Sequence, residues 1–72
     1  MKKLKKIKIK VNGKIKTIID KLTLYELIND LKIPIIKVAI ELNKEIISKK
    51  EIKKIKLEND DVIEIVHFIG GG

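Results

Sequence analysis

The chain has 72 residues, which suffice for one small domain but leave little room for both a hydrophobic core and an enclosed active-site cavity. It contains no cysteine, which excludes disulfides, thiolate metal sites and cysteine nucleophiles, and its one histidine, His67, cannot form a histidine-rich metal site. No segment approaches the roughly 20 apolar residues of a membrane span, and no secretory signal is recognisable at the basic N-terminus. We therefore expect a cytoplasmic protein without a metal site or a catalytic residue of its own.

The net charge of +7 raises the question of a nucleic-acid partner. All 17 basic residues are lysine, although arginine supplies most of the bidentate contacts to bases and phosphates. The aromatic residues are only Tyr25 and Phe68, which are too few for a platform on which bases stack. A general bias toward lysine and isoleucine accounts for the composition. Nucleic-acid binding is therefore not expected, although a basic nucleic-acid-binding module stays open as an alternative.

Two strands joined by a tight turn are expected near the N-terminus. Residues 5–11 alternate between lysine and an aliphatic residue, which is typical of a half-buried strand. Asn12-Gly13 is a strong hairpin signal, because both turn positions need a positive φ. Residues 14–19 then form the returning strand, with lysines along its outer face.

A helix is expected next. Thr23 and Glu26 have the spacing of a capping box, in which each side chain accepts a hydrogen bond from the other residue's backbone N–H. Apolar residues then recur at the spacing of one helical face, at Leu24, Leu27, Ile28 and Leu31. The helix is expected to run from about Leu24 to Leu31 or Lys32. Pro34 is expected to end it, because the residue before a proline is pushed out of the helical region.

The second half of the chain predicts three further strands. In order, we expect a strand at 38–42, a turn at 43–44, a short return strand at 45–47, a helical turn or irregular loop at 48–56, a turn at 58–61 and a last strand at 62–68. His67 is expected at the end of that strand as an ordinary strand residue. It has no titratable neighbour in sequence with which it could act as a catalyst or ligand.

This order of elements predicts an α+β fold with the β-grasp arrangement. One main helix packs on one face of a mixed four- to five-stranded sheet, and the nearly all-apolar last strand lies in the centre, parallel to the first. We expect residues 1–69 to form this domain and residues 70–72 to form a flexible tail. The sheet face opposite the helix would carry Val62, Val66 and Phe68, which are candidates for docking a partner.

The printed sequence ends in Gly70, Gly71 and Gly72, directly after the last strand. Glycine has no Cβ, so a glycine thread fits a narrow channel and adopts backbone angles that are closed to other residues. Residues 69–72 span at most about 14 Å when extended, which is enough to enter a buried active site while the domain stays outside. A frayed terminus is the plain alternative.

Four segments carry a resemblance to a known family: VNGK (11–14), TLYELI (23–28), VAIELNKEII (38–47) and DVIEIVHFIGGG (61–72). Through these four segments the chain resembles the ubiquitin-like sulfur carriers of the ThiS/MoaD superfamily, and most closely those of thiamine thiazole biosynthesis. The most specific part is the β-strand that runs into a terminal diglycine. The family commonly has glycine where this chain has Lys44 and Asp60. It also commonly has Pro-Arg and Trp where this chain has Ser48-Lys49 and Ile52.

The resemblance implies a sulfur carrier that enzymes act on, rather than an enzyme. A ThiF- or MoeB-like activating enzyme would use ATP and magnesium to join the Gly72 carboxylate to AMP, while Gly70, Gly71 and Gly72 thread its active site. A persulfide derived from a cysteine desulfurase would displace AMP and leave a thiocarboxylate on Gly72. That group would deliver sulfur to thiazole synthase. ATP and magnesium would belong to the partner, so no tightly bound cofactor is expected.

Several alternatives stay open at this stage. Sulfur carriers for molybdopterin synthesis or tRNA thiolation use the same chemistry at Gly72 and differ only in the acceptor. A ubiquitin-like conjugator would instead join Gly72 to a lysine through an isopeptide bond. A nucleic-acid-binding module would show a steep salt dependence of binding. The sulfur donor, the acceptor and the oligomeric state are not determined by these residues.

Overall fold

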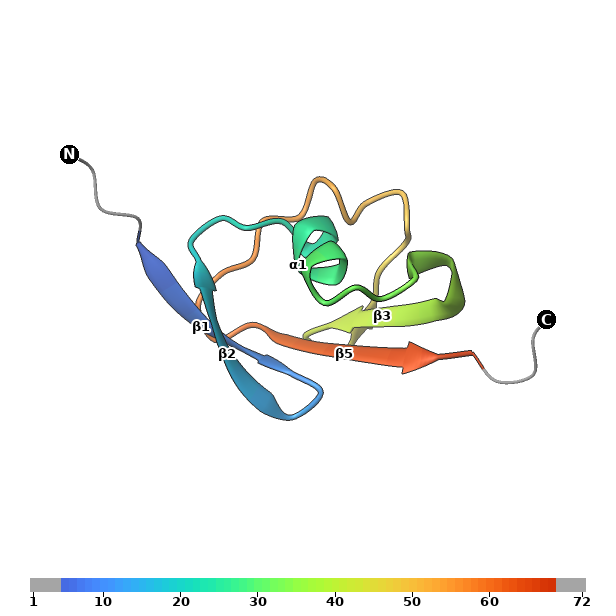
Figure 1. Cartoon of the computed structure of the whole chain (residues 1–72), viewed down its shortest axis with the longest axis horizontal. Helices are drawn as coiled ribbons and strands as arrows, with labels where there is room; N and C mark the ends of the chain where they lie inside the picture. The colour runs from blue at the N-terminus through green and yellow to red at the C-terminus, as the bar shows by residue number, and fades with distance from the viewer. Residues whose placement is uncertain (1–4, 69–72) are drawn as a thin grey trace.

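The computed structural model describes residues 5–68, in which a helix lies on one side of a β-sheet (Figure 1). The elements in chain order are β1 (Lys6–Val11), β2 (Lys14–Ile19), α1 (Leu24–Asp30), a short 3-10 helix η1 (Ile35–Lys37), β3 (Val38–Leu42), β4 (Glu45–Ile46) and β5 (Val62–His67). All five strands and α1 lie where the sequence pattern predicts them, and η1 is the one element of this series that was not expected. Within residues 5–68, no helix is long and apolar enough to cross a membrane.

The strands lie in the order β2-β1-β5-β3-β4, so the last strand of the sequence occupies the centre of the sheet. β5 runs parallel to β1, with Lys10 opposite Val62, and antiparallel to β3, with Ile65 opposite Ile40. The β1–β2 and β3–β4 pairs are antiparallel hairpins. The expected mixed sheet, with the apolar last strand between the first and the third, is therefore confirmed.

The core lies between α1 and the sheet and is entirely aliphatic. Its buried side chains are Ile7, Ile9, Ile18, Leu24, Leu27, Ile28, Val38, Ile40, Ile52, Leu57, Ile63 and Ile65. These residues alternate along β1 and β5 and recur at helical spacing along α1, so the sequence periodicity identified the buried face of each element. The opposite side of the sheet, which faces away from α1, is called the outer face below.

Thr23 caps α1 as predicted. Its hydroxyl accepts the Glu26 N–H at 3.0 Å, and the Glu26 carboxylate accepts the Thr23 N–H at 2.9 Å. The Thr23 hydroxyl also donates to the same carboxylate oxygen at 3.0 Å. The pKa of Glu26 is held below its ordinary value, because hydrogen bonds favour the charged carboxylate. The larger effect comes from the Thr23 backbone N–H and the smaller one from the Thr23 hydroxyl.

The segment between β4 and β5 crosses the helix side of the sheet as turns and irregular structure, as expected. It places Ile52 in the core. It also accepts hydrogen bonds from the first turn of α1, because the Leu24 N–H donates to the Ile55 carbonyl at 2.9 Å and the Tyr25 N–H to the Ile52 carbonyl at 3.1 Å. Of the N–H groups that the helix leaves open at its start, those of Leu24 and Tyr25 are therefore satisfied by this segment, and the capping box satisfies the others.

The end of α1 differs from the expectation. The helix stops at Asp30, and the next residues form a Schellman motif: the Lys32 N–H donates to the Asn29 carbonyl at 2.9 Å and the Ile33 N–H to the Ile28 carbonyl at 3.3 Å. Lys32 adopts a left-handed backbone with a φ of 59°. The helix is therefore ended by this motif before the chain reaches the proline that was expected to end it.

Two turns need the left-handed backbone that glycine adopts most easily. Lys44 has a φ of 71° and Asp60 a φ of 72°, and both stand where the resembling family commonly has glycine. Asp tolerates this region better than most residues, whereas a lysine there is strained. Both turns therefore hold a non-glycine residue in a conformation that glycine adopts more easily.

The predicted orientation of β2 is wrong. The antiparallel register of β1 and β2 pairs Ile9 with Lys16 and Ile7 with Ile18. The β2 lysines therefore share the face of the buried Ile18. The outer face of β2 carries Ile15 and Ile19, which are 70% and 40% exposed. The two-residue turn sets this register, because strand residues directly opposite one another point to the same face.

Candidate functional site

The central strand β5 is held by asparagines from two turns. At its start, the Asn43 N–H donates to the Val62 carbonyl at 2.7 Å and the Asn43 Oδ1 accepts the Val62 N–H at 2.9 Å. Further along, the Asn12 Oδ1 accepts the Ile65 N–H at 2.7 Å and the Asn12 Nδ2 donates to the Ile65 carbonyl at 3.3 Å. Both asparagines have a positive φ, of 52° and 48° respectively. The strand that leads toward the C-terminal glycines is therefore fixed at two points.

The end of β5 is anchored on β3 and the residue before it. His67 lies opposite Val38 as the last residue of the strand, where it was expected. The next residue, Phe68, donates its N–H to the Lys37 carbonyl at 2.9 Å. The described part of the chain therefore ends on a hydrogen-bonded position.

The predicted reactive tail lies outside the described residues. The structure covers residues 5–68, so the proposed site of modification at Gly72, the threading residues Gly70 and Gly71 and the domain boundary after residue 69 stay predictions. What the structure does describe is the strand and the surface from which this segment continues.

The three residues proposed for partner docking share the outer face. Val62, Val66 and Phe68 are 37%, 57% and 61% exposed. Val66 lies opposite Ala39 of β3, and Phe68 continues the same register opposite Lys37. The placement predicted from the alternation along β5 is therefore observed, and it leaves these side chains accessible.

A lysine that is not among the predicted docking residues lies over one of them. The Lys49 Nζ is 5.6 Å from the centroid of the Phe68 ring, which is within the range of a cation–π contact. Lys49 belongs to the irregular segment after β4. Because such a segment has no period, no pattern in the sequence places its lysine beside the end of β5.

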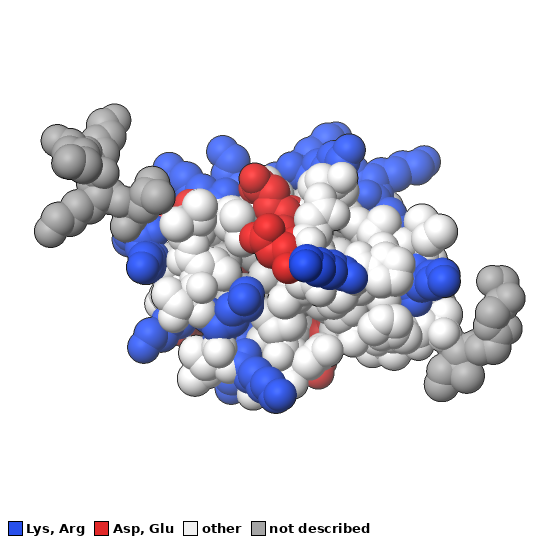
Figure 2. Space-filling view, viewed as in Figure 1, with Lys and Arg blue, Asp and Glu red and all other residues white. Residues whose placement is uncertain are grey.

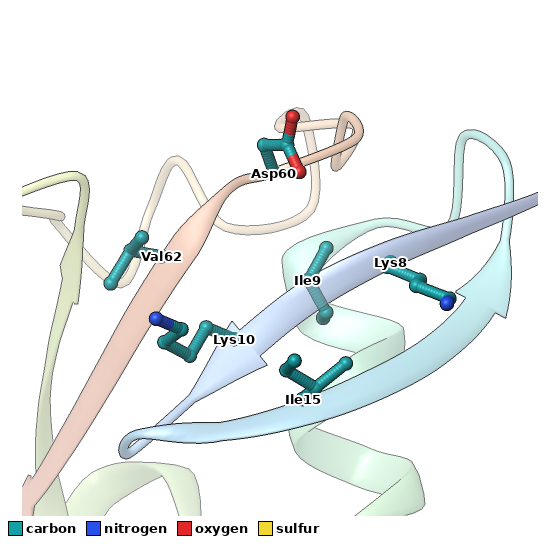
Figure 3. A pocket seen from close by; sticks show the side chains of 6 residues that line it. All are labelled: Lys8, Ile9, Lys10, Ile15, Asp60 and Val62. Atoms are coloured by element: carbon teal, nitrogen blue, oxygen red, sulfur yellow. The ribbon is translucent and has the colours of Figure 1, made fainter.

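The outer face is hollowed between the β1–β2 hairpin and the start of β5 (Figure 3). The hollow has a volume of about 400 Å³ and is lined by Lys8, Ile9, Lys10, Ile15, Asp60 and Val62. Lys10 stands in the middle, because its register partners are Ile15 on β2 and Val62 on β5. The predicted docking face thus carries Val62 and Val66 along β5, with the exposed Glu64 between them, and is bordered by the lysines of β1.

Charge is distributed unevenly over the surface. In the view of Figure 2, lysine side chains spread around the outline of the molecule, and most of the acidic surface visible on this face forms one compact group. On this face there is no single basic stripe of the kind that marks a nucleic-acid interface. Among residues 5–68, no group of three or more histidine, aspartate or glutamate side chains is placed to hold a metal ion.

The arrangement matches proteins of known family. The structure superposes on the crystal structure of the thiamine biosynthesis protein ThiS from Geobacter metallireducens with a TM-score of 0.81 and 30% identity, over 92% of this chain and 100% of that one. The sequence model of the ThiS family matches residues 9–72. The chain belongs to the ThiS family. This membership confirms the predicted resemblance and the β-grasp fold, and the ThiS match includes the glycines that follow β5.

Two further relatives of this ThiS-family chain have informative names. The sulfur carrier protein ThiS of Bacillus subtilis is 48% identical over 56 residues, which are 78% of this chain and 76% of that protein. The thiazole synthase of Paramagnetospirillum magneticum is 35% identical over 66 residues, which are 92% of this chain but 20% of that protein. A stretch that resembles nearly all of this chain is therefore part of a much longer protein named thiazole synthase.

Proposed function

We propose that this ThiS-family chain is a sulfur carrier of thiamine biosynthesis, which enzymes load with sulfur at Gly72. The observation that carries the proposal is the family match, which runs through β5 to residue 72. The geometry supports it, because β5 is central, held by two asparagines and anchored again at Phe68. A well-held domain followed by a short glycine thread suits an enzyme that must receive a carboxylate in a buried site.

Activation of Gly72 is the first proposed step, because a carboxylate is a poor electrophile. A ThiF- or MoeB-like enzyme would bind ATP and magnesium. A Gly72 carboxylate oxygen attacks the α-phosphorus, pyrophosphate leaves, and an acyl-adenylate forms. The partner contributes the nucleotide site and the metal, which neutralises the phosphate charge. The carrier contributes the carboxylate and two neighbouring glycines that have no side chain to block the approach.

Sulfur transfer to the acyl-adenylate is the second step. The terminal sulfur of a persulfide, supplied through a cysteine desulfurase, attacks the carbonyl carbon and AMP leaves. A second thiol then cleaves the sulfur–sulfur bond, which leaves a thiocarboxylate on Gly72 and a disulfide on the donor side. Because this chain has no cysteine, both sulfur nucleophiles come from partners. In this proposal the chain is a co-substrate of the enzymes.

We infer that thiazole synthase accepts the sulfur. The support is the stretch of the Paramagnetospirillum thiazole synthase that resembles 92% of this chain. Joining a carrier to an acceptor in one polypeptide raises their effective concentration, which is useful when both serve one reaction sequence. This favours thiazole formation over molybdopterin synthesis and tRNA thiolation, which share the chemistry at Gly72.

We also propose that the outer face docks the activating enzyme through Val62, Val66 and Phe68. The three side chains are accessible and follow one strand that leads directly to the tail. Exposed apolar side chains beside a reactive segment are typical of an interaction surface, and the strip formed here is interrupted by one charged residue, Glu64. Seating this strip would bring the following residues to a defined entrance on the partner.

Intact mass tests the loading reaction. The carrier is incubated with the activating enzyme from the same organism, ATP, magnesium and a persulfide source, and we expect the mass gain of one oxygen-to-sulfur exchange, located at Gly72 by fragmentation. Omitting ATP, or deleting Gly72, should abolish the gain. A complete reaction that leaves the mass unchanged would contradict the proposal. An isopeptide bond from Gly72 to a lysine would identify a conjugating protein instead.

The acceptor is tested with the loaded carrier. Addition of a complete thiazole synthase reaction should return the mass to that of the carboxylate as thiazole forms. A matched incubation with a molybdopterin synthase large subunit and its substrate should leave the thiocarboxylate intact. The reverse pattern would assign the carrier to molybdopterin synthesis while leaving the chemistry at Gly72 in place.

A further inference from the structure

Lys49 and Phe68 form an exposed pair at the point where the described chain ends. The ammonium lies 5.6 Å from the ring centroid, and the ring is 61% exposed. The backbone that carries the ring is held in place, because the Phe68 N–H donates to the Lys37 carbonyl at 2.9 Å. A positive charge is therefore held next to the segment that carries the proposed chemistry.

A second lysine–aromatic pair in the same protein shows what distinguishes this one. The Lys53 Nζ lies 4.7 Å from the ring centroid of Tyr25. Tyr25 is half-buried and packs against the core, so its ring already has an intramolecular role. Phe68 is on the outer face and is not among the described residues that pack against the core. Its ring and the ammonium above it are both available to a partner.

The charges along the outer face differ between its two ends. Glu41 and Glu64 lie directly opposite one another on β3 and β5. Near the start of β5, Asp60 borders the hollow together with Lys8 and Lys10, so acidic and basic groups are mixed there. At the other end of β5, Phe68 is hydrogen-bonded to the backbone of the exposed Lys37 and lies under the ammonium of Lys49. The charge that a described contact places on the exposed Phe68 ring is therefore positive. We call Lys37, Lys49, Val66 and Phe68 the tail root.

We propose that the tail root binds a site on the activating enzyme made of an apolar pocket for the Phe68 ring bordered by an aspartate or glutamate that pairs with Lys49. This inference rests on the proposed function and adds the chemistry of the partner surface. The apolar ring supplies contact area, while the charge pair fixes orientation and speeds association with an acidic surface. Together they align the domain so that the following residues enter in one register.

The position of Lys49 makes a specific kinetic prediction. Residues 69–72 separate the tail root from the reacting carboxylate by up to about 14 Å when extended. The ammonium therefore acts on docking and does not take part in bond making. Changes at Lys49 should alter KM for the carrier in the adenylation reaction and leave kcat unchanged, because kcat reports the complex in which the tail is already seated.

The test compares Lys49→Gln and Lys49→Glu with Lys53→Gln and Lys53→Glu in ATP–pyrophosphate exchange by the activating enzyme from the same organism. We expect KM to rise roughly fivefold for Lys49→Gln and more than about tenfold for Lys49→Glu. The Lys53 variants change the net charge equally and also remove a cation–π contact, so they control for both effects. We expect their KM to stay within about twofold of the original.

Salt dependence provides a second readout of the same experiment. Raising sodium chloride from about 0.05 M to about 0.5 M should shrink the difference between Lys49→Glu and the original protein, because exposed charge pairs are screened. Equal KM changes in the Lys49 and Lys53 variants, or a Lys49 effect confined to kcat, would overturn the inference. If the original protein supports no exchange at all, the proposed function fails and not this inference alone.

Discussion

The side chain of Asn12 hydrogen-bonds both backbone groups of Ile65, accepting its N–H at 2.7 Å and donating to its carbonyl at 3.3 Å. β1 ends at Val11, and its in-register pairing with β5 covers only two residues, so the side chain continues the ladder where the β1 backbone turns away. A turn residue thus supports the strand that leads to the proposed reactive end, although the two are far apart in the sequence.

Replacing Asn12 with glycine should weaken this strand. Asn12→Gly keeps a residue that tolerates the positive φ of 48° but removes both hydrogen bonds. Ile65 is only 6% exposed, so its backbone groups are poorly placed to find water, and the loss should cost about 1–3 kcal/mol. We expect a lower Tm, faster amide exchange at Ile65 and a reduced kcat/KM for adenylation, because the tail would then be less well positioned.

Asn43 provides the matched control. Asn43→Gly also keeps a residue suited to a positive φ and removes a side-chain hydrogen bond to β5, but at Val62, at the start of the strand. We expect faster exchange at Val62 and an adenylation rate close to the original at a temperature where both variants are folded. If the two variants lower adenylation equally, a positioning role for Asn12 is wrong and only a general loss of stability remains.

Lys32 should be replaceable by glycine with a gain in stability. It adopts a left-handed φ of 59° at the end of α1, a conformation that costs a residue with a side chain about 1–2 kcal/mol. Glycine avoids this cost but loses more entropy on folding, so we expect a net gain of about 0.5–1 kcal/mol for Lys32→Gly. Thermal unfolding should show an increase in Tm of about 2–8 °C, because 1 kcal/mol shifts the Tm of a domain of this size by about 4–8 °C.

A lysine with an ordinary backbone serves as the comparison. Lys54 is exposed and is not among the described residues with a positive φ. Lys54→Gly removes the same charge, so any gain that comes from charge alone would appear in both variants. We expect Lys54→Gly to leave Tm unchanged or to lower it. A gain of the same size would show that relief of the left-handed lysine is not the cause.

The sequence predicted best those elements along which buried residues recur with a fixed period. β1, α1 and β5 were predicted because burial repeats along them with the period of their own backbone. The orientation of β2 was missed although the information was present. The two-residue turn at Asn12-Gly13 places Val11 opposite Lys14, and this register puts the β2 lysines on the helix side.

Other features have no local signal. The Lys49–Phe68 contact and the hydrogen bonds from Asn12 to Ile65 join segments that are distant in the chain and meet only when the sheet has formed. The Schellman motif that ends α1 was missed, because a lysine is an uncommon residue at its left-handed position. Of the candidate site, the alternation along β5 therefore predicted the docking face, whereas the contacts that hold the strand and the charge beside it required the structure.

The capping box should give the protein a stability that depends on pH. The pKa of Glu26 is lowered from its ordinary value of 4.5 by the Thr23 N–H and hydroxyl. The unfolded chain therefore binds a proton more readily than the folded one, so this contribution is present above about pH 4.5 and is lost as the pH falls through the lowered pKa. Urea unfolding across this range should show the stability advantage over Glu26→Gln shrinking as the pH falls.

Thr23 tests the same motif at neutral pH. Thr23→Ala removes the acceptor for the Glu26 N–H and the second donor to the carboxylate, and we expect a loss of about 0.5–2 kcal/mol. In the Thr23→Ala variant, the part of the folding stability that is lost at low pH should also become smaller, because the hydroxyl no longer donates to the Glu26 carboxylate. A pH dependence equal to that of the original protein would show that the backbone N–H alone sets it.

Phe68 should matter for docking more than for folding. Its ring is 61% exposed, so Phe68→Ala removes little buried area and should change Tm only slightly. Loss of an aromatic anchor at an interface typically costs about 2 kcal/mol or more in binding, so affinity for the activating enzyme should fall at least about thirtyfold. Ile15→Ala, at an exposed site on the same face but away from the end of β5, is the control. Undiminished affinity of Phe68→Ala would argue against docking through this residue.

Two changes at Gly72 test how closely the side-chain size and the tail length fix the position of the reacting carboxylate. Gly72→Ala adds a methyl group beside the carbon that ATP activation and sulfur attack must reach, and displacement by even about 1 Å can cost about a hundredfold in rate. One additional residue after Gly72 moves the carboxylate beyond the position that the tail length sets. We expect slow thiocarboxylate formation by Gly72→Ala and none by the extended chain, measured as intact mass over time. Tm should be unchanged in both, because the buried core of the described residues is formed by residues 7–65. An extended chain that is still converted at its new tip would show that the tail length does not position the reacting carbon.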